Sequence, residues 1–160
     1  MKKVLHRSCK TIGTRFYLFY HHNMPSLYQK YLATIKKWVW KAVDFDWKYA
    51  NQCVDFVKKY AKELDYPITT YGNAKDFARI GLGQYWTRVY PPAVWDIVIF
   101  PNGKYWHIAV VNSFEWAKLY VHEQNRDGKA YANNNEKSLW SLVALGMYTL
   151  KGNEVFFRVK

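Results

Sequence analysis

The sequence predicts an α+β fold, with helices first and antiparallel strands after them. Two segments, 27–42 and 53–64, place apolar residues at helical spacing. Beyond Pro91 and Pro92 the pattern changes to short apolar runs separated by turn residues, which is typical of strands. Because no linker and no internal repeat divides the chain, we expect the helices to pack on a single sheet.

The composition is that of a folded, strongly basic protein. Of the 160 residues, 50% are hydrophobic and 19% are aromatic, and the formal net charge is +12. The chain is long enough to bury a core, and it contains no apolar run of membrane-spanning length. Basic residues interrupt its first segment, so we expect no signal peptide. The charge indicates polyanionic partners, nucleic acid or an anionic wall polymer, or else a solvated face that aids solubility.

Residues 1–25 are interpreted as a basic extension ahead of one domain at 26–160. The extension is expected to be a packed structural segment; a contact with the cell wall or membrane, or a leader, are the alternatives. The sequence has two cysteines, Cys9 and Cys53, which are too few for a disulfide framework. Both are predicted to be free thiols.

The first predicted helix spans residues 26–42, with Ser26 as its N-cap after a proline. A second helix begins at Cys53 and ends near Leu64, before a proline, and a short third helix is expected over 73–79. The apolar stripe of the first helix consists of Leu27, Tyr28, Tyr31, Leu32, Ile35, Trp38, Val39 and Ala42.

Strands are expected throughout the C-terminal part, arranged as an antiparallel sheet. A turn at 101–104 joins the first two of them as a hairpin. The expected strands cover 95–100, 105–111, 118–125, 141–150 and 154–159.

Cys53 is a candidate nucleophile because it opens a helix. Unpaired N–H groups and the positive end of the helix dipole stabilise a thiolate there. A thiolate needs a base, and the base needs a group that orients it. Period-two alternation puts Glu123 and Asn125 on one face of their strand, from which both could reach His107 if the two strands pair.

Each of these residues alone has a plainer interpretation: a buried small cysteine, a satisfied histidine and a polar strand end. Their order, together with the segments around them, favours catalysis. The other histidines, His6, His21, His22 and His122, are interpreted as surface residues.

The segments around the candidate residues form an ordered set. They are Gln52–Phe56, Gly72–Phe77, Trp95–Phe100, His107–Val111, Glu123–Asn125 and Val155–Val159. This set resembles the CHAP family, the cysteine, histidine-dependent amidohydrolases/peptidases of phage endolysins and bacterial cell-wall hydrolases. The resemblance covers roughly residues 26–160 and implies a papain-like (NlpC/P60-type) fold, with the nucleophile helix packed on the sheet.

The resemblance also implies roles for the matched residues. Cys53 would be the nucleophile, and His107 the base that later protonates the leaving amine. Glu123 would be the third member and Asn125 the fourth. Gln52 would build the oxyanion hole together with the backbone N–H of Cys53.

Many members of the family carry glycine before this histidine, where the present chain has Trp106. A bulky aromatic side chain at that position predicts a narrower or reshaped groove beside His107. The tryptophans of the chain are expected to lie mostly in the core, with Trp47 and Trp106 near the substrate groove.

An acidic loop precedes the nucleophile. Asp44, Asp46 and Asp55 place three carboxylates close together in the sequence, which suits a hard cation. The resemblance implies a calcium site at these positions, completed by the backbone carbonyls of Lys48 and Ala50. The alternative is that the carboxylates only end one helix and stabilise the start of the next. Neither zinc nor an organic cofactor is expected.

The resemblance implies a peptidoglycan hydrolase that cuts an amide bond, as an N-acetylmuramoyl-L-alanine amidase or as a stem or cross-bridge endopeptidase. The basic charge would hold it on anionic wall polymers. We expect a monomer that is made in the host cytoplasm and acts on the wall after release, through a holin if it is an endolysin. A catalytically idle wall-binding or phage-tail module is the first alternative. Binding of single-stranded nucleic acid is the second, disfavoured because the aromatic residues follow core periodicity.

Overall fold

The computed structural model describes residues 25–47, 51–126 and 142–160, so Cys9 and all of the predicted extension except its last residue lie outside the described part. Within that part, three helices precede six strands. The helices are α2 (Pro25–Trp38), α3 (Cys53–Glu63) and α4 (Ala74–Ile80). The strands are β1 (Trp86–Val89), β2 (Ile97–Phe100), β3 (His107–Glu115), β4 (Lys118–Glu123), β5 (Ala144–Thr149) and β6 (Val155–Val159).

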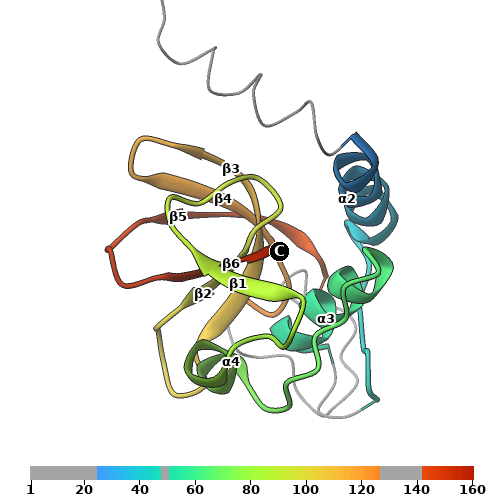
Figure 1. Ribbon diagram of the computed structural model, residues 1–160, viewed down its shortest axis with the longest axis horizontal. Helices are drawn as coiled ribbons and strands as arrows, with labels where there is room; N and C mark the ends of the chain where they lie inside the picture. The colour runs from blue at the N-terminus through green and yellow to red at the C-terminus, as the bar shows by residue number, and fades with distance from the viewer. Residues whose placement is uncertain (1–24, 48–50, 127–141) are drawn as a thin grey trace, which may run out of the picture.

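All six strands belong to one antiparallel sheet in the order β1-β6-β2-β3-β4-β5. The predicted α+β class is therefore confirmed. Figure 1 shows α2 and α3 beside one another along one side of the curved sheet, with α4 near β2. Among the described helices, none has the length and apolar character needed to cross a membrane.

The sheet buries apolar side chains on both of its faces. On the helix-covered face, Phe56 of α3 and Phe77 of α4 belong to one core with Ile108 of β3, and all three are 0% exposed. The opposite face, inside the curve of the sheet, has a second core. It consists of Val98, Phe100, Ala109, Val111, Leu119, Val121 and Phe156.

Helix α3 forms where the sequence predicts it, because its apolar residues share one face. Phe56, Val57 and Tyr60 are fully buried at this spacing. The backbone N–H of Gln52 donates to the carboxylate of Asp55 over 2.8 Å. This contact gives a hydrogen-bond partner to a backbone N–H group at the start of the helix. Burial of one face against β3 and this reciprocal contact fix the position of Cys53, the first residue of the helix.

Strand pairing places five residues of the candidate site region on the inner face of the sheet. Phe100 of β2 lies opposite His107 of β3, and residues directly opposite in an antiparallel pair share a face. In β4 and β5, Val121 lies opposite Gly146 and Leu119 opposite Tyr148. Glu123, two residues after Val121, is on the same face by alternation.

The first helix is shorter than predicted. It ends at Trp38 instead of continuing to residue 42, because the chain turns at Trp40, which has a φ of 64°. The N–H of Trp40 donates to the carbonyl of Val143 over 2.8 Å, and Val39 forms a parallel bridge with the same residue. Leu32, assigned to the apolar stripe, is 46% exposed.

Strand β1 was missed, and several predicted strand ends are wrong; the strand expected over 105–111, for example, is His107–Glu115. The sequence of β1 has apolar ends around Thr87 and Arg88, both exposed, so it gives no period-two signal. The strand predicted from residue 95 begins at Ile97, because Trp95 has a φ of 67°. The strand predicted to residue 125 ends at Glu123, because Asn125 has a φ of 56°.

Candidate active site

Cys53, His107 and Glu123 meet at the N-terminal end of α3. Cys53 is a half-buried free thiol that shares a hydrogen bond with the imidazole of His107. On the other side of the ring, Nε2 of His107 lies 2.7 Å from Oε2 of Glu123. Because Glu123 occupies Nε2, Nδ1 is the nitrogen left to face the sulfur. The structure thus places the Cys53 thiol, the His107 imidazole and the Glu123 carboxylate in one hydrogen-bonded series.

Electrostatics around His107 favour its protonated form. Burial alone would lower the pKa of this imidazole, since its side chain is almost completely enclosed. Hydrogen bonds to Cys53 and Glu123, and the charges of both groups, outweigh burial and raise the pKa to about 9. At neutral pH the site therefore holds an imidazolium beside the sulfur, the arrangement that stabilises a thiolate.

Strand β5 and the end of β2 hold Glu123 in place. The hydroxyl of Tyr148 donates to the same oxygen, Oε2, that binds His107. The ring of Tyr148 stacks on Phe100 with 4.1 Å between the centroids. The second oxygen, Oε1, is buried without a hydrogen-bond partner in the described part, and Nε of Arg126 lies 3.7 Å from it.

Gly146 makes the space that Glu123 occupies. A Cβ atom built on this glycine would lie 1.7 Å from Oε1 of Glu123, far inside contact distance. Sequence reasoning identified neither Gly146 nor Tyr148, because no pattern in the sequence reveals that their strand pairs with β4 beside Glu123. The alternation in β5, with Leu145 and Met147 exposed, was the available signal.

The two predicted amides, Gln52 and Asn125, bind each other. Nδ2 of Asn125 donates to Oε1 of Gln52 over 2.9 Å. The amide nitrogen of Gln52 is the donor end of the same side chain. Asn125 lies beyond the end of β4 and has a left-handed backbone, so strand alternation does not place its side chain, and the expectation that it shares the face of Glu123 stays a prediction.

Gln124 is a further positioning group that the sequence reasoning missed. Its side chain is buried and pairs reciprocally with the backbone of Val43, accepting from the N–H over 2.8 Å and donating to the carbonyl over 2.7 Å. The same Nε2 also donates to the carbonyl of Gln52 over 3.0 Å. Gln124 thereby joins the end of β4 to the residues on either side of the acidic loop.

The acidic loop forms a cluster of three carboxylates. Asp44, Asp46 and Asp55 each offer an oxygen within 4.8 Å of the others. Burial raises the pKa of Asp55 to about 7; the N–H of Gln52 opposes this shift, and the charges of Asp46 and Asp44 add to it. Mutual repulsion of this kind is what a bound cation relieves, so the donor set fits a hard divalent ion.

Asp55 also agrees with the alternative that the carboxylate stabilises the start of a helix, because it accepts a hydrogen bond from the N–H of Gln52 at the start of α3. The other two predicted ligands, Lys48 and Ala50, lie outside the described residues. Asp44 accepts the backbone N–H of Trp47 over 2.7 Å, which shapes the loop. The three carboxylates are thus brought together, while the carbonyl ligands stay a prediction.

The remaining predicted aromatic and histidine positions give mixed outcomes. Trp106 is half-buried and lies directly before His107, whereas Trp47 is 87% exposed on the acidic loop. Trp40 and Trp116 are also exposed, at 66% and 93%, so the expectation that most tryptophans lie in the core is wrong for these residues.

His122, predicted to lie at the surface, is half-buried. Its Nε2 lies 3.2 Å from Oδ1 of Asn112, and its Nδ1 is buried without a partner in the described part of the chain. Burial lowers the pKa of His122 to about 4, so the ring is neutral at pH 7. The remaining histidines lie outside the described residues: His6, His21 and His22.

The fold and this line of residues define a class of protein. The family model described as CHAP domain matches residues 43–125, more than half of the chain and a range that includes the acidic loop, Cys53, His107 and Asn125. The chain belongs to the CHAP domain family. No curated protein matches it.

Two solved structures share the fold. A wild-type endolysin, LysIME-EF1, superposes with a TM-score of 0.62 and 21% sequence identity, covering 83% of this chain and 63% of that protein. Ly7917 gives a TM-score of 0.51 and 16% identity over 80% of this chain and 61% of the other. This chain therefore spans less than two thirds of either protein. The likeness agrees with the papain-like α+β fold that the sequence predicts.

Proposed function

We propose that the protein is a peptidoglycan hydrolase that cuts an amide bond of the bacterial cell wall, with Cys53 as nucleophile. The observation that carries the proposal is the line from Cys53 through His107 to Glu123 at the start of α3, in a member of the CHAP family. Here a raised histidine pKa of about 9 keeps a proton beside the sulfur.

Catalysis would begin with attack of the Cys53 thiolate on the carbonyl carbon of the amide. The backbone N–H of Cys53 and Nε2 of Gln52 would stabilise the oxyanion, with Asn125 holding Oε1 of Gln52. His107 would then give its proton to the leaving amine as the C–N bond breaks, which leaves a thioester on the sulfur. Water, deprotonated by His107, would attack that thioester and release the acid and the thiolate.

The same sequence of steps serves two kinds of bond. An N-acetylmuramoyl-L-alanine amidase cuts between glycan and peptide stem, and an endopeptidase cuts within the stem or the cross-bridge. Both reactions present a carbonyl to the sulfur and an amine to His107, so the chemistry of the site accepts either.

The acidic cluster would hold a calcium ion. Asp44, Asp46 and Asp55 supply carboxylate oxygens, and the carbonyls of Lys48 and Ala50 would complete the set. The ion would supply positive charge that relieves carboxylate repulsion and fixes the loop two residues from Cys53. No step of amide cleavage passes through it.

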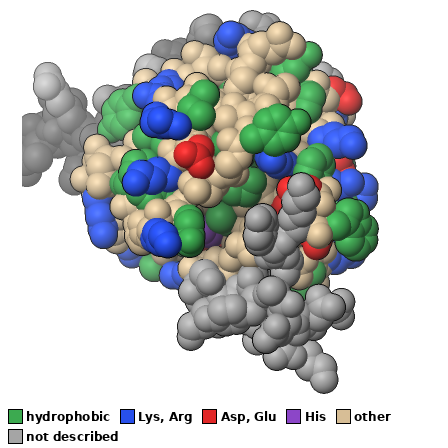
Figure 2. Space-filling view, turned by 90° about the horizontal axis from the view of Figure 1, so that it is seen from below, with side chains coloured by type: hydrophobic (Ala, Val, Ile, Leu, Met, Phe, Trp, Pro, Cys, Tyr) green, Lys and Arg blue, Asp and Glu red, His purple; other side chains and the backbone are tan. Residues whose placement is uncertain are grey.

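The protein would act at the cell wall as a monomer, after synthesis in the host cytoplasm and release, through a holin if it is an endolysin. The charge of +12 supports retention on anionic wall polymers. Figure 2 shows Lys and Arg side chains spread over one face with few Asp and Glu among them. Attraction of this kind is nonspecific and weakens with salt.

Lysis of purified cell walls tests the proposal. Cys53→Ala is expected to abolish the loss of turbidity while leaving the melting temperature and wall binding unchanged. Mass spectrometry of defined muropeptides digested by the wild-type protein would then identify the amide that is cut. Equal lysis by the wild type and Cys53→Ala, or wall binding with no cleavage product at all, would reject the enzyme in favour of an idle wall-binding module.

A further inference from the structure

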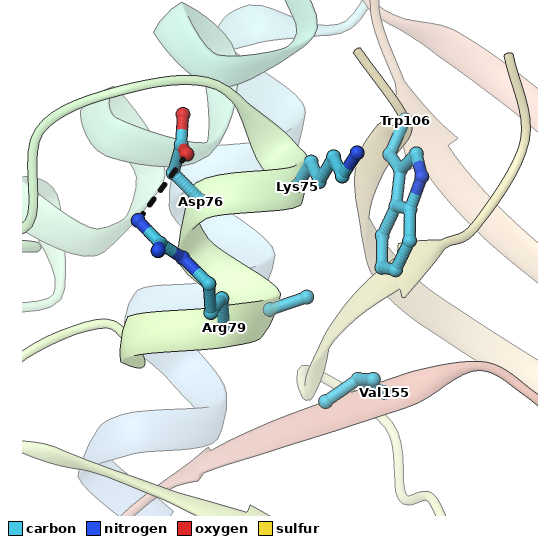
Figure 3. A pocket seen from close by; sticks show the side chains of 6 residues that line it. Lys75, Asp76, Arg79, Trp106 and Val155 are labelled. Carbon is cyan, nitrogen blue, oxygen red and sulfur yellow. Dashed lines mark ion pairs between the residues drawn. The ribbon is translucent and has the colours of Figure 1, made fainter. Parts of the chain in front are cut away.

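A pocket of about 600 Å³ lies between α4 and the sheet, outside the line of residues described above. Figure 3 shows Lys75 reaching from α4 toward the indole of Trp106, with Val155 of β6 below them in this view. The wall is formed by Lys75, Asp76, Ala78, Arg79, Trp106 and Val155. Trp106 immediately precedes His107, so one wall of the pocket adjoins the proposed catalytic base.

Trp106 holds a backbone conformation that tryptophan seldom adopts. Its φ of 62° lies in the left-handed region, where a side chain beyond Cβ costs free energy and glycine does not. The loop is fixed to the helix by a hydrogen bond of 3.2 Å from the N–H of Lys75 to the carbonyl of Tyr105. The same conformation is shared by Trp40, Trp47, Trp95 and Trp116. What distinguishes Trp106 is therefore the place of its side chain in the pocket wall, directly before His107.

The charges in the pocket leave one cation uncompensated. Lys75 and Arg79 of α4 both line the pocket, but Figure 3 shows Lys75 directed toward Trp106 and Arg79 directed toward Asp76. Arg79 lies 4.0 Å from Asp76, whereas the ammonium of Lys75 has no carboxylate within salt-bridge distance among the described residues. Two cations and one carboxylate give the pocket a positive balance beside an aromatic wall.

We propose that this pocket binds a carboxylate-bearing residue of the peptide stem next to the scissile amide. Lys75 receives the carboxylate, and the indole of Trp106 packs on the alkyl part of the same residue. The inference rests on the proposed function, since it assigns the pocket to the same substrate. It adds a selectivity: a stem with a free carboxylate is preferred over one in which that group is a carboxamide.

Two soluble muropeptides that differ only in this group, carboxylate or carboxamide, provide the test. For the wild type, KM is expected to be roughly five- to tenfold lower for the carboxylate form, as one charge-assisted hydrogen bond allows. Lys75→Gln should remove the difference while kcat stays within about twofold. Lys104→Gln removes an equal charge from the adjacent loop outside the pocket, and its preference should match the wild type.

Trp106→Gly tests the contact of the indole with substrate, and its melting temperature is measured alongside. Glycine relieves the left-handed backbone but removes an indole that packs against the core, so the melting temperature should fall; at a temperature where the variant is folded, KM should rise for both muropeptides. A wild type without preference between the two muropeptides, or an equal loss of preference in Lys104→Gln, would overturn the subsite.

If the protein is not a hydrolase, the wild type will release no product from either muropeptide, a result that differs from the loss of preference described above. In that case titration of both compounds into the Cys53→Ala protein, followed by tryptophan fluorescence, still reports the pocket. Tighter binding of the carboxylate form that is lost in a Cys53→Ala/Lys75→Gln double variant supports the subsite, and equal binding of both forms rejects it.

Discussion

Gly146 faces the carboxylate of Glu123 so closely that a methyl group on the glycine would lie 1.7 Å from Oε1. This glycine has an ordinary backbone conformation, so its role is space and not flexibility. The room it leaves allows Glu123 to sit against β5 and reach the imidazole of His107 at 2.7 Å. The spacing of two strands thus sets the geometry of the candidate base.

Gly146→Ala tests this dependence. The added methyl group must displace Glu123, so we expect kcat to fall by roughly 100-fold, a loss comparable to that of one oriented catalytic hydrogen bond. Overpacking of this kind costs about 1–3 kcal/mol of the free energy of unfolding. Leu145→Ala is the matched control, because Leu145 is 56% exposed on the other face of the same strand. Full activity in Gly146→Ala would contradict the positioning of Glu123.

Tyr148→Phe removes one hydrogen-bond donor from Glu123 and keeps the ring that stacks on Phe100. A carboxylate with one donor fewer attracts the imidazolium proton more strongly, so the pKa of His107 should rise. We therefore expect the alkaline limb of the activity profile to move to higher pH, with kcat lowered roughly three- to tenfold. If the alkaline limb of the Tyr148→Phe profile does not move, Tyr148 contributes packing alone.

Tyr120→Phe is the control for this variant. It deletes the same hydroxyl from the adjacent strand, where Tyr120 points to the opposite face from Glu123. Its pH profile should superimpose on that of the wild type.

Protonation of His107 predicts how activity and stability vary with pH. Its pKa is raised from 6.5 to about 9 in the folded protein by Cys53 and Glu123, against the effect of burial. The stabilisation is therefore complete below pH 6.5 and is lost as the pH rises through about 9. We expect kcat/KM and the free energy of unfolding to decline over the same range.

NMR titration of the imidazole checks this assignment directly. The His107 ring should change its shift near pH 9, whereas the ring of His122, whose pKa is lowered to about 4 by burial, should not titrate in that range. Titration of His107 near its ordinary value would contradict the imidazolium form of the site.

Local pattern was enough to predict the elements that carry Cys53 and His107. Helix α3 has a strong apolar face, and β2 and the first half of β3 are buried runs on either side of a turn. Residues close in sequence therefore determine the helix and the hairpin. Pairing of β3 with β4 then follows from their short connection and brings Glu123 to the ring. This part of the site is local in sequence.

The parts that escaped prediction depend on distant segments. The end of α2 at Trp38 is set by Val143, and the space for Glu123 by Gly146, and neither partner is near in sequence. Glutamine is usually a surface residue, yet the side chain of Gln124 is 1% exposed because it forms hydrogen bonds with the backbone of Val43. Buried polar groups that bind backbone have no periodic signature, so the sequence alone does not reveal them.

Calcium addition tests the acidic cluster. A ligand that binds only the folded state raises the free energy of unfolding by about 2.7 kcal/mol at a concentration ~100 times its Kd. We therefore expect calcium to raise the melting temperature and a chelator to reverse the effect. Asp46→Asn should abolish this response because it removes a carboxylate from the cluster.

Asp65→Asn serves as the control for the calcium response. Asp65 lies outside the cluster, in an exposed ion pair with Lys30, and asparagine tolerates its φ of 70°. Its melting temperature should still rise with calcium. Magnesium should act more weakly, because it requires a tighter octahedral shell than this loop of carboxylates and carbonyls would form. If neither calcium nor a chelator changes the melting temperature of the wild type, the calcium site is rejected. Capping of α3 by Asp55 is then the role of the cluster.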